Sequence, residues 1–219
     1  CEADPASAAR VLAFEPAAFW RKWAPSGVRF VYCSSGCVWD GPYRDDGGSF
    51  RGWDPPSPRS AHGHVRGLAE YLLGSVSKER LSILRPRLLF SPSLHPSNLL
   101  VRLLKYEKVI ESPESMTSVA PVAKTIQALV AGGLFWRGEV WCCYNRCATT
   151  PFSLATVMSD KGMRAPPVPM TAAEEAALRP KRGHTVMRDA AFENVVKPPT
   201  VMDEAIAYID RIKDQIRDR

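Results

Sequence analysis

The chain has 219 residues, of which 45% are hydrophobic and 24% are charged, with a formal net charge of +6. This length suits one domain with or without a small extra lobe, and this composition excludes a disordered chain. No apolar run approaches the ~20 residues of a membrane-spanning helix, so no membrane span is expected. Lys and Arg are spread along most of the chain and match no nucleic-acid-binding motif. A scattered basic surface is therefore preferred over a specific nucleic-acid partner or a phosphorylated ligand.

The cysteines favour free thiols in a reducing compartment, either the cytoplasm or an organelle matrix. Their spacing does not resemble the disulfide framework of a small secreted domain. Two of them are adjacent and would point to opposite faces of a strand, and no second pair stands at zinc spacing, so no metal site is predicted. The six are Cys1, Cys33, Cys37, Cys142, Cys143 and Cys147.

In the first half of the chain, apolar residues at helical spacing predict a helix over 4–24, with Pro16 as a candidate kink. The β-branched and aromatic run 28–33 predicts a buried strand. Residues 40–60 are rich in Gly and Pro and predict a long loop, and long loops within compact domains are usually functional. A helix over 63–75 and a strand over 82–86 follow.

In the second half, residues 97–107 are predicted to be helical, and a short strand begins at 109–110. Further elements are a helix over 121–131, a strand over 139–144, a helix over 152–159 and a proline-rich connector over 164–171. Thr171 and Glu174 form a capping box that begins a short helix ending at 178. A final helix spans 201–217. Strands that alternate with helices predict an α/β fold with a Rossmann-like parallel sheet covered by helices on both faces, and a small C-terminal lobe.

Three motifs occur in an order that resembles the extended short-chain dehydrogenase/reductases. The first strand ends in Ser34-Ser35-Gly36-Cys37, a later helix begins with His62-Gly63-His64-Val65-Arg66, and the next strand ends in Arg85-Pro86. The most specific resemblance lies further on, in Pro96–Arg102, Lys105–Ile110 and Pro113–Thr117. In the same order and without gaps, these segments are similar to those of dTDP-4-dehydrorhamnose reductases and UDP-4-keto-rhamnose 3,5-epimerase/4-reductases.

This resemblance implies a partial Rossmann-like core over 1–160, with an interleaved substrate-lobe segment at about 93–118, and a C-terminal lobe and terminal helix over 161–219. It also implies that the N-terminal glycine-rich turn for the cofactor pyrophosphate is missing, because no glycine-rich motif of that kind occurs in the sequence. The expected cofactor is NAD(P) if such a part is supplied, and none otherwise. A sheet cut in this way would expose an edge, so either the sequence is a fragment or another chain or larger complex completes the sheet.

The family's catalytic positions are only partly kept. Ser35 matches the Ser/Thr that hydrogen-bonds the substrate carbonyl, and Cys37 matches the epimerase cysteine. His62 stands where the family has its proton-donating Tyr, and Arg66 stands where it has the Lys. Arg102 replaces the epimerase Lys. Because Arg exchanges no proton at neutral pH and imidazole is shorter than a phenol, ordinary reduction is not expected.

The resemblance also implies binding positions. The cofactor-binding candidates are Ser34, Arg66, Arg85 and Pro86. The substrate-binding candidates are Asn98, Arg102, Met116, Thr117 and Arg179.

Three of the candidate site residues also have a purely structural interpretation. His62 would be a surface residue on a proline-rich loop, Cys37 a small core residue, and Arg85 a residue that stabilises the loop above the sheet.

Two functions from different classes follow from these patterns. The first is a catalytically degenerate protein with an NAD(P)-binding fold, kept as a binding or structural subunit. The second is an active NAD(P)H-dependent epimerase/reductase of 4-keto-sugar nucleotides, with His62 as an unusual acid. In the second case the partner is a sugar nucleotide.

Overall fold

The computed structural model describes residues 3–40, 49–132, 138–178 and 183–218. A three-stranded parallel sheet lies at its centre, in the order β1 (Phe30–Cys33), β2 (Leu81–Pro86) and β6 (Glu139–Cys143). The register pairs Tyr32 with Ile83 and Leu84 with Trp141. Among the strands that are described, β1 pairs only with β2.

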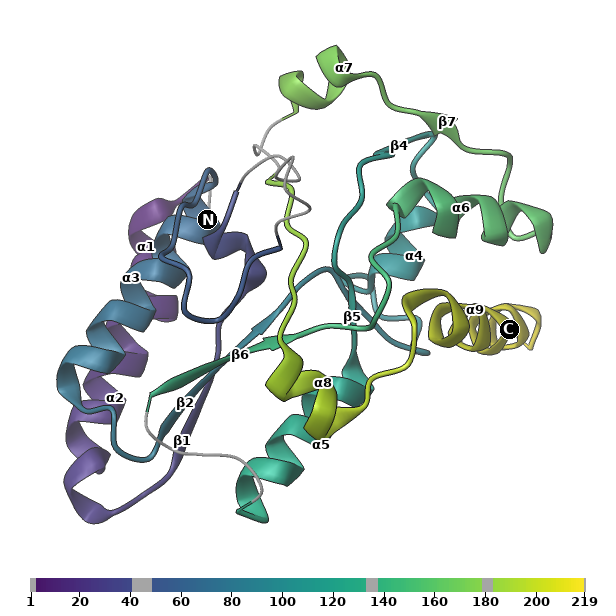
Figure 1. Cartoon of the computed structure of the whole chain (residues 1–219). Helices are drawn as coiled ribbons and strands as arrows, with labels where there is room; N and C mark the ends of the chain where they lie inside the picture. The colour runs from purple at the N-terminus through teal and green to yellow at the C-terminus, as the bar shows by residue number, and fades with distance from the viewer. Residues whose placement is uncertain (1–2, 41–48, 133–137, 179–182, 219) are drawn as a thin grey trace.

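Helices cover both faces of this sheet, as the alternating pattern predicts (Figure 1). One face packs against α2 (Glu15–Trp23) and α3 (Ala61–Val76), with Trp20, Leu73 and Ile83 in a shared buried cluster. The other face packs against α5 (Val119–Val130) and α8 (Ala190–Val196), with Leu84 and Phe192 buried between them. The expected Rossmann-like α/β architecture is therefore confirmed.

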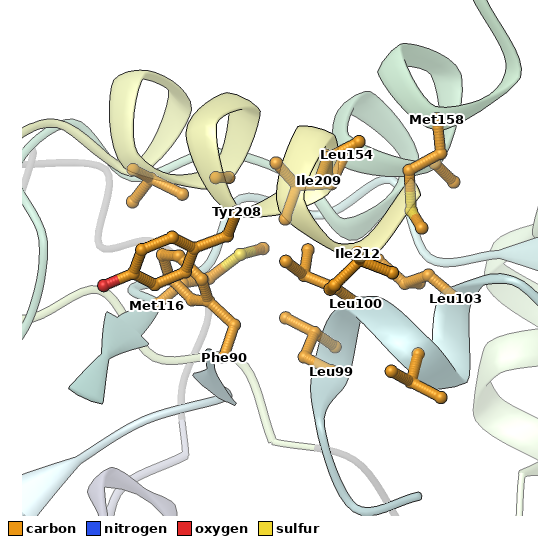
Figure 2. Packing of buried hydrophobic residues seen from close by; sticks show 14 of the residues in the cluster. Phe90, Leu99, Leu100, Leu103, Met116, Leu154, Met158, Tyr208, Ile209 and Ile212 are labelled. Atoms are coloured by element: carbon orange, nitrogen blue, oxygen red, sulfur yellow. The ribbon is translucent and has the colours of Figure 1, made fainter. Parts of the chain in front are cut away.

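A second lobe lies beside the carboxyl ends of the strands (Figure 1). It contains α4 (Leu99–Leu103), α6 (Pro151–Asp160) and α9 (Val201–Arg217), with two short parallel pairs, β3 (Leu89–Phe90) with β5 (Thr117–Ser118) and β4 (Lys108–Val109) with β7 (Val168–Pro169). Figure 2 shows its separate core, in which Phe90, Met116 and Ile209 meet between α4, α6 and α9. The lobe therefore has its own hydrophobic support and can form a wall opposite the sheet.

The N-terminal helix is interrupted near Pro16. It consists of α1 (Pro5–Ala9), a π-helical turn over Arg10–Phe14, and α2, and it ends in a 3₁₀ turn over Ala24–Ser26. Proline has no N–H to donate to the carbonyl four residues earlier, which belongs to Leu12. Tyr32 of β1 satisfies that carbonyl, because its hydroxyl donates to Leu12 O at 2.6 Å. The irregularity thus anchors the helix to the first strand.

Some predicted elements differ from the structure. The helix expected over 97–107 is confined to α4, and Arg164 donates to the backbone carbonyls of Leu103 and Tyr106 just beyond it. The connector expected over 164–171 contains β7, and the capping box then begins α7 (Ala172–Ala177). Helix α8 was not predicted from the sequence, although Asp189 caps it by accepting from Phe192 N. Within the described ranges, no helix is long and apolar enough to cross a membrane.

Candidate functional site

A cavity of about 680 Å³ lies between the carboxyl ends of β1 and β2 and the second lobe. Ligands of open α/β folds bind at this end of the strands. Cys37, His62 and Arg87 line it from the sheet side. From the lobe side its lining is mostly apolar and includes Leu99, Leu103, Val109, Ile110, Pro151 and Met170.

Cys37 reaches the cavity on a short 3₁₀ turn, Gly36–Val38, that follows β1. Ser35 caps this turn, because its hydroxyl oxygen accepts from the backbone N–H of Cys37 at 3.1 Å. The predicted Ser35 therefore contacts the backbone of Cys37, but of the two only Cys37 is among the described residues that line the cavity. The cap uses one lone pair of the Ser35 hydroxyl and stabilises the backbone turn that carries Cys37.

The N-terminus of α3 brings His62 against Cys37. Ser60 caps the helix by accepting from Gly63 N at 3.1 Å. Any side chain at Gly63 would collide with the carbonyl oxygen of Cys37, so the helix backbone packs directly on the turn. The imidazole of His62 interacts with the thiol of Cys37 as a result and lowers the pKa of that thiol. The first turn of α3 thus places the two side chains as a pair.

Arg66 lies one helical turn after His62 and is not among the residues that line the cavity. Its Nε donates to His62 Nε2 at 3.2 Å, and its Nη1 donates to Tyr32 Oη and to Cys33 O, each at 2.9 Å. Because His62 Nε2 accepts from a permanent cation, the neutral imidazole carries its proton on Nδ1. The predicted His62 and Arg66 therefore form one connected group with Cys37.

A buried arginine that the sequence analysis did not single out completes this group. Arg87 is 5% exposed and donates from Nη1 to Cys37 Sγ at 2.8 Å. Its Nε and Nη2 donate to the carboxylate of Glu114 at 2.8–3.0 Å. Burial alone would raise the pKa of Cys37, but the His62 hydrogen bond and the Arg87 charge outweigh it and lower this pKa to about 6. The pKa of Arg87 is raised, because the charges of Glu114 and Cys37 outweigh its burial.

His184 extends the same network toward α7. Its Nδ1 lies 3.4 Å from Glu114 Oε1 and its Nε2 lies 3.0 Å from Glu175 Oε1. The nearby carboxylate of Glu114, together with the charges of Glu175 and Asp40, raises the pKa of His184 against the effect of burial. Gly183, just before it, accepts from Arg87. Gly183 of the cavity wall and the neighbouring His184 are therefore joined to the residues around the thiol.

The predicted cofactor-side residues of the sheet form a separate buried network. Ser34 and Arg85 both bind Glu70 of α3, and Arg85 Nε lies 3.0 Å from its carboxylate. Arg85 also donates to Gly52 O at 3.2 Å and stacks over the ring of Trp39. This arrangement matches the structural interpretation, in which Arg85 stabilises the loop above the sheet. Pro86 ends β2 beside Cys143 and, like Ser34 and Arg85, does not contribute to the cavity lining.

The predicted substrate-side residues are divided between the cavity and the core. Arg102 lines the cavity, and its Nε and Nη2 donate to Tyr106 Oη at 3.1 and 2.9 Å. Asn98 instead caps α4 and is buried with its amide bonded to the 91–93 turn. Met116 lies in the lobe core, and Thr117 accepts from Arg87 N and donates to Cys143 O. Arg179 lies outside the described residues.

The described lining is electropositive. Arg59, Arg102 and Lys108 contribute cationic side chains in addition to Arg87, whereas Glu114 is the one carboxylate among the described lining residues. Arg59 lies 3.8 Å from Asp40, and Lys108 pairs with Glu174. The sequence analysis did not name Arg87 or Lys108 as site residues. Arg87 could have been found from its position directly after Arg85-Pro86, and Lys108 from its place within the segment that carries the resemblance.

Comparisons with known proteins give matches in structure only. No protein-family model matches the chain, and no curated protein matches it in sequence. A UDP-rhamnose synthase from Acanthamoeba polyphaga mimivirus superposes with a TM-score of 0.80 at 14% identity, covering 91% of this chain and 70% of that one. A dTDP-4-dehydrorhamnose reductase from Clostridium acetobutylicum gives 0.82 at 17% identity, covering 97% and 76%.

A third similar structure was solved with a cofactor. It is a dTDP-4-dehydrorhamnose reductase from Bacillus anthracis in complex with NADP, with a TM-score of 0.76 at 17% identity and coverage of 95% of this chain and 74% of that one. At these identities the comparisons establish a shared fold. The expected resemblance to nucleotide-sugar enzymes of the dehydrogenase/reductase type is confirmed at that level.

Proposed function

We propose that this chain is a sugar-nucleotide-binding protein that lacks the reductive acid–base pair of the enzymes whose fold it shares. It acts through binding, alone or as a subunit, and does not transfer hydride to a ketone in their usual way. The fold similarity supports a ligand of the nucleotide-sugar class, because the similar structures are named as enzymes of such substrates.

The arrangement of Arg66 is the observation that carries this proposal. In the resembled family a Lys at this position holds the nicotinamide ribose and lowers the pKa of the catalytic Tyr. Arg66 donates to three internal acceptors on Tyr32, Cys33 and His62. It cannot exchange a proton at neutral pH, and its Nε and Nη1 already have partners. These residues do not fit a nicotinamide ribose in the family's manner, so we assign no hydride step to the chain.

The cavity lining supports the choice of ligand. Its volume of about 680 Å³ lies within the range of about 300–1,000 Å³ that is usual for small-molecule sites. Arg59, Arg102 and Lys108 supply charges suited to a diphosphate, since Arg and Lys are common phosphate ligands. The apolar wall of α4 and β4 suits the flat faces of a base and a sugar ring.

The competing function is an active epimerase/reductase that uses His62 as its acid. The pairing of His62 with Cys37 favours it, because both side chains line the cavity. Against it, Arg102 replaces the second proton-exchanging residue, and His62 Nε2 is occupied by Arg66. We therefore rank it below binding without reduction.

Calorimetric titration with UDP and with dTDP tests the proposal. We expect saturable binding that weakens about tenfold or more in Arg102→Gln, because a hydrogen bond to a charged group contributes about 1.5–3 kcal/mol. Lys105→Gln is the matched control, because it removes the same charge from the end of the same segment without lining the cavity. Equal affinities for the two variants would contradict the proposed site.

A kinetic measurement separates the two functions. The chain is incubated with NADPH and UDP-4-keto-6-deoxyglucose, and absorbance of the reduced cofactor is followed. We expect no turnover above background. Turnover that is lost in His62→Ala would instead establish the epimerase/reductase.

A further inference from the structure

The thiol of Cys37 lies at the wall of a ligand-sized cavity, in direct contact with a buried cation. Cys37 Sγ receives a hydrogen bond of 2.8 Å from Arg87 Nη1, and His62 lines the same cavity from the start of α3. Arg87 is itself buried and held by Glu114 through both carboxylate oxygens, so it cannot move away from the sulfur without breaking a buried ion pair. The charge beside Cys37 is therefore fixed in place.

The other described cysteines are not held in this way. Cys142 and Cys143 are buried in the sheet, where burial raises the pKa of each thiol. Cys33 is exposed, and partial burial of its sulfur raises its pKa against the charge of Arg66. The thiolate form is the nucleophile in cysteine chemistry, and electropositive, partly exposed positions are those where it becomes reactive. Among the described residues that line the cavity, Cys37 is the single thiol.

We propose that Cys37 is a nucleophile that adds reversibly to the carbonyl carbon of a ketone-bearing sugar nucleotide in the cavity. This inference rests on the proposed function for the class of ligand. The sulfur lone pair forms the C–S bond as the carbonyl π pair moves to oxygen, and the resulting alkoxide takes a proton from water. No electrons are exchanged with an oxidant or reductant. The product is a hemithioketal, and reversal of the same steps releases the ketone.

The surroundings of Cys37 favour addition of its sulfur to a carbonyl carbon over a role in acid–base catalysis. Arg102, across the cavity at the position of the resembled family's second proton-exchanging residue, cannot give or take a proton at neutral pH, and Lys108 on the same side is held in an ion pair with Glu174. When sulfur bonds to carbon, the negative charge moves to the adjacent oxygen and stays close to Arg87. The residues that stabilise the thiolate are thus placed to stabilise the adduct as well.

Carbon NMR of UDP-4-keto-6-deoxyglucose labelled with ¹³C at its keto carbon tests the proposal. We expect the labelled signal to move from the ketone region to that of a tetrahedral carbon bonded to sulfur when the protein is added. This signal should be absent with Cys37→Ser and retained with Cys33→Ser, which makes the same change at an exposed thiol. A tetrahedral signal that persists in Cys37→Ser arises from hydration of the ketone and would overturn the assignment.

A second measurement keeps the test independent of ligand binding and of the folding of a variant. Iodoacetamide labelling of the unmodified protein is mapped by peptide mass spectrometry across pH. We expect the labelling rate of Cys37 to level off above about pH 7, whereas that of Cys33 should continue to rise through about pH 9. Parallel pH profiles of labelling for the two thiols would overturn the assignment of Cys37 as a nucleophile. If UDP does not bind but Cys37 still shows a labelling profile distinct from that of Cys33, the proposed function alone is refuted.

Discussion

Replacement of Cys37 by Ser should remove a pH-dependent part of the protein's stability. The folded-state pKa of Cys37 is about 6, whereas its ordinary value is 9.0. A group whose pKa is lowered on folding contributes stability that is complete above its unfolded pKa and is lost as pH falls through its folded pKa. In this case the window runs from about pH 9 down to about pH 6.

The magnitude follows from the two pKa values. The linkage relation gives a contribution of about 0.4 kcal/mol at about pH 6 and about 2.7 kcal/mol at about pH 8. The wild-type free energy of unfolding should therefore rise relative to that of Cys37→Ser by about 2 kcal/mol between these conditions. His184 titrates in both proteins, so its own contribution cancels from the difference.

Urea denaturation of both proteins under reducing conditions at about pH 6 and about pH 8 provides the measurement. Cys33→Ser is the control and should show no such gain, because the pKa of Cys33 is raised rather than lowered in the folded protein. The reasoning is refuted if wild type and Cys37→Ser differ by the same amount at both pH values.

Three further changes test the supporting structure. Glu70→Gln should lower the free energy of unfolding, measured by urea denaturation, by about 3–5 kcal/mol, because it leaves Arg85 buried without its counter-charge. A loss as small as that of Glu15→Gln, which changes an exposed ion pair, would contradict this. Gly63→Ala should destabilise the protein by about 1–3 kcal/mol or more, because the new methyl group would collide with the Cys37 carbonyl. Gly74→Ala has open space around it and should stabilise the protein by about 0.5–1 kcal/mol. Similar melting temperatures for the two variants would refute the close packing of Gly63 on Cys37. His184→Gln should have a lower free energy of unfolding than wild type at low pH, and this difference should disappear as pH rises. The reason is that a raised folded-state pKa contributes stability that is lost as pH rises through that pKa. A difference that stays constant with pH would exclude the ion pairs of His184.

The sequence by itself determined the alternation of strands and helices and therefore the parallel sheet. Periodicity of apolar residues reports which face of a helix is buried, and this signal is strong in α5 and α9, whereas β2 is buried at every position. The resemblance of the motifs also predicted that Ser35, Cys37 and His62 belong to one site, and of these Cys37 and His62 line the same cavity.

The roles of the charged residues were decided only by tertiary structure. Arg85 and Arg87 are two positions apart, yet Arg85 pairs with Glu70 away from the cavity while Arg87 pairs with Glu114 and contacts Cys37. Which carboxylate each meets depends on elements far along the chain, and no local pattern encodes those distances. The pKa of Cys37 likewise depends on burial, on a charge and on a hydrogen bond contributed by three separate segments. The sequence therefore identified the thiol, and the packing of those segments decided its chemistry.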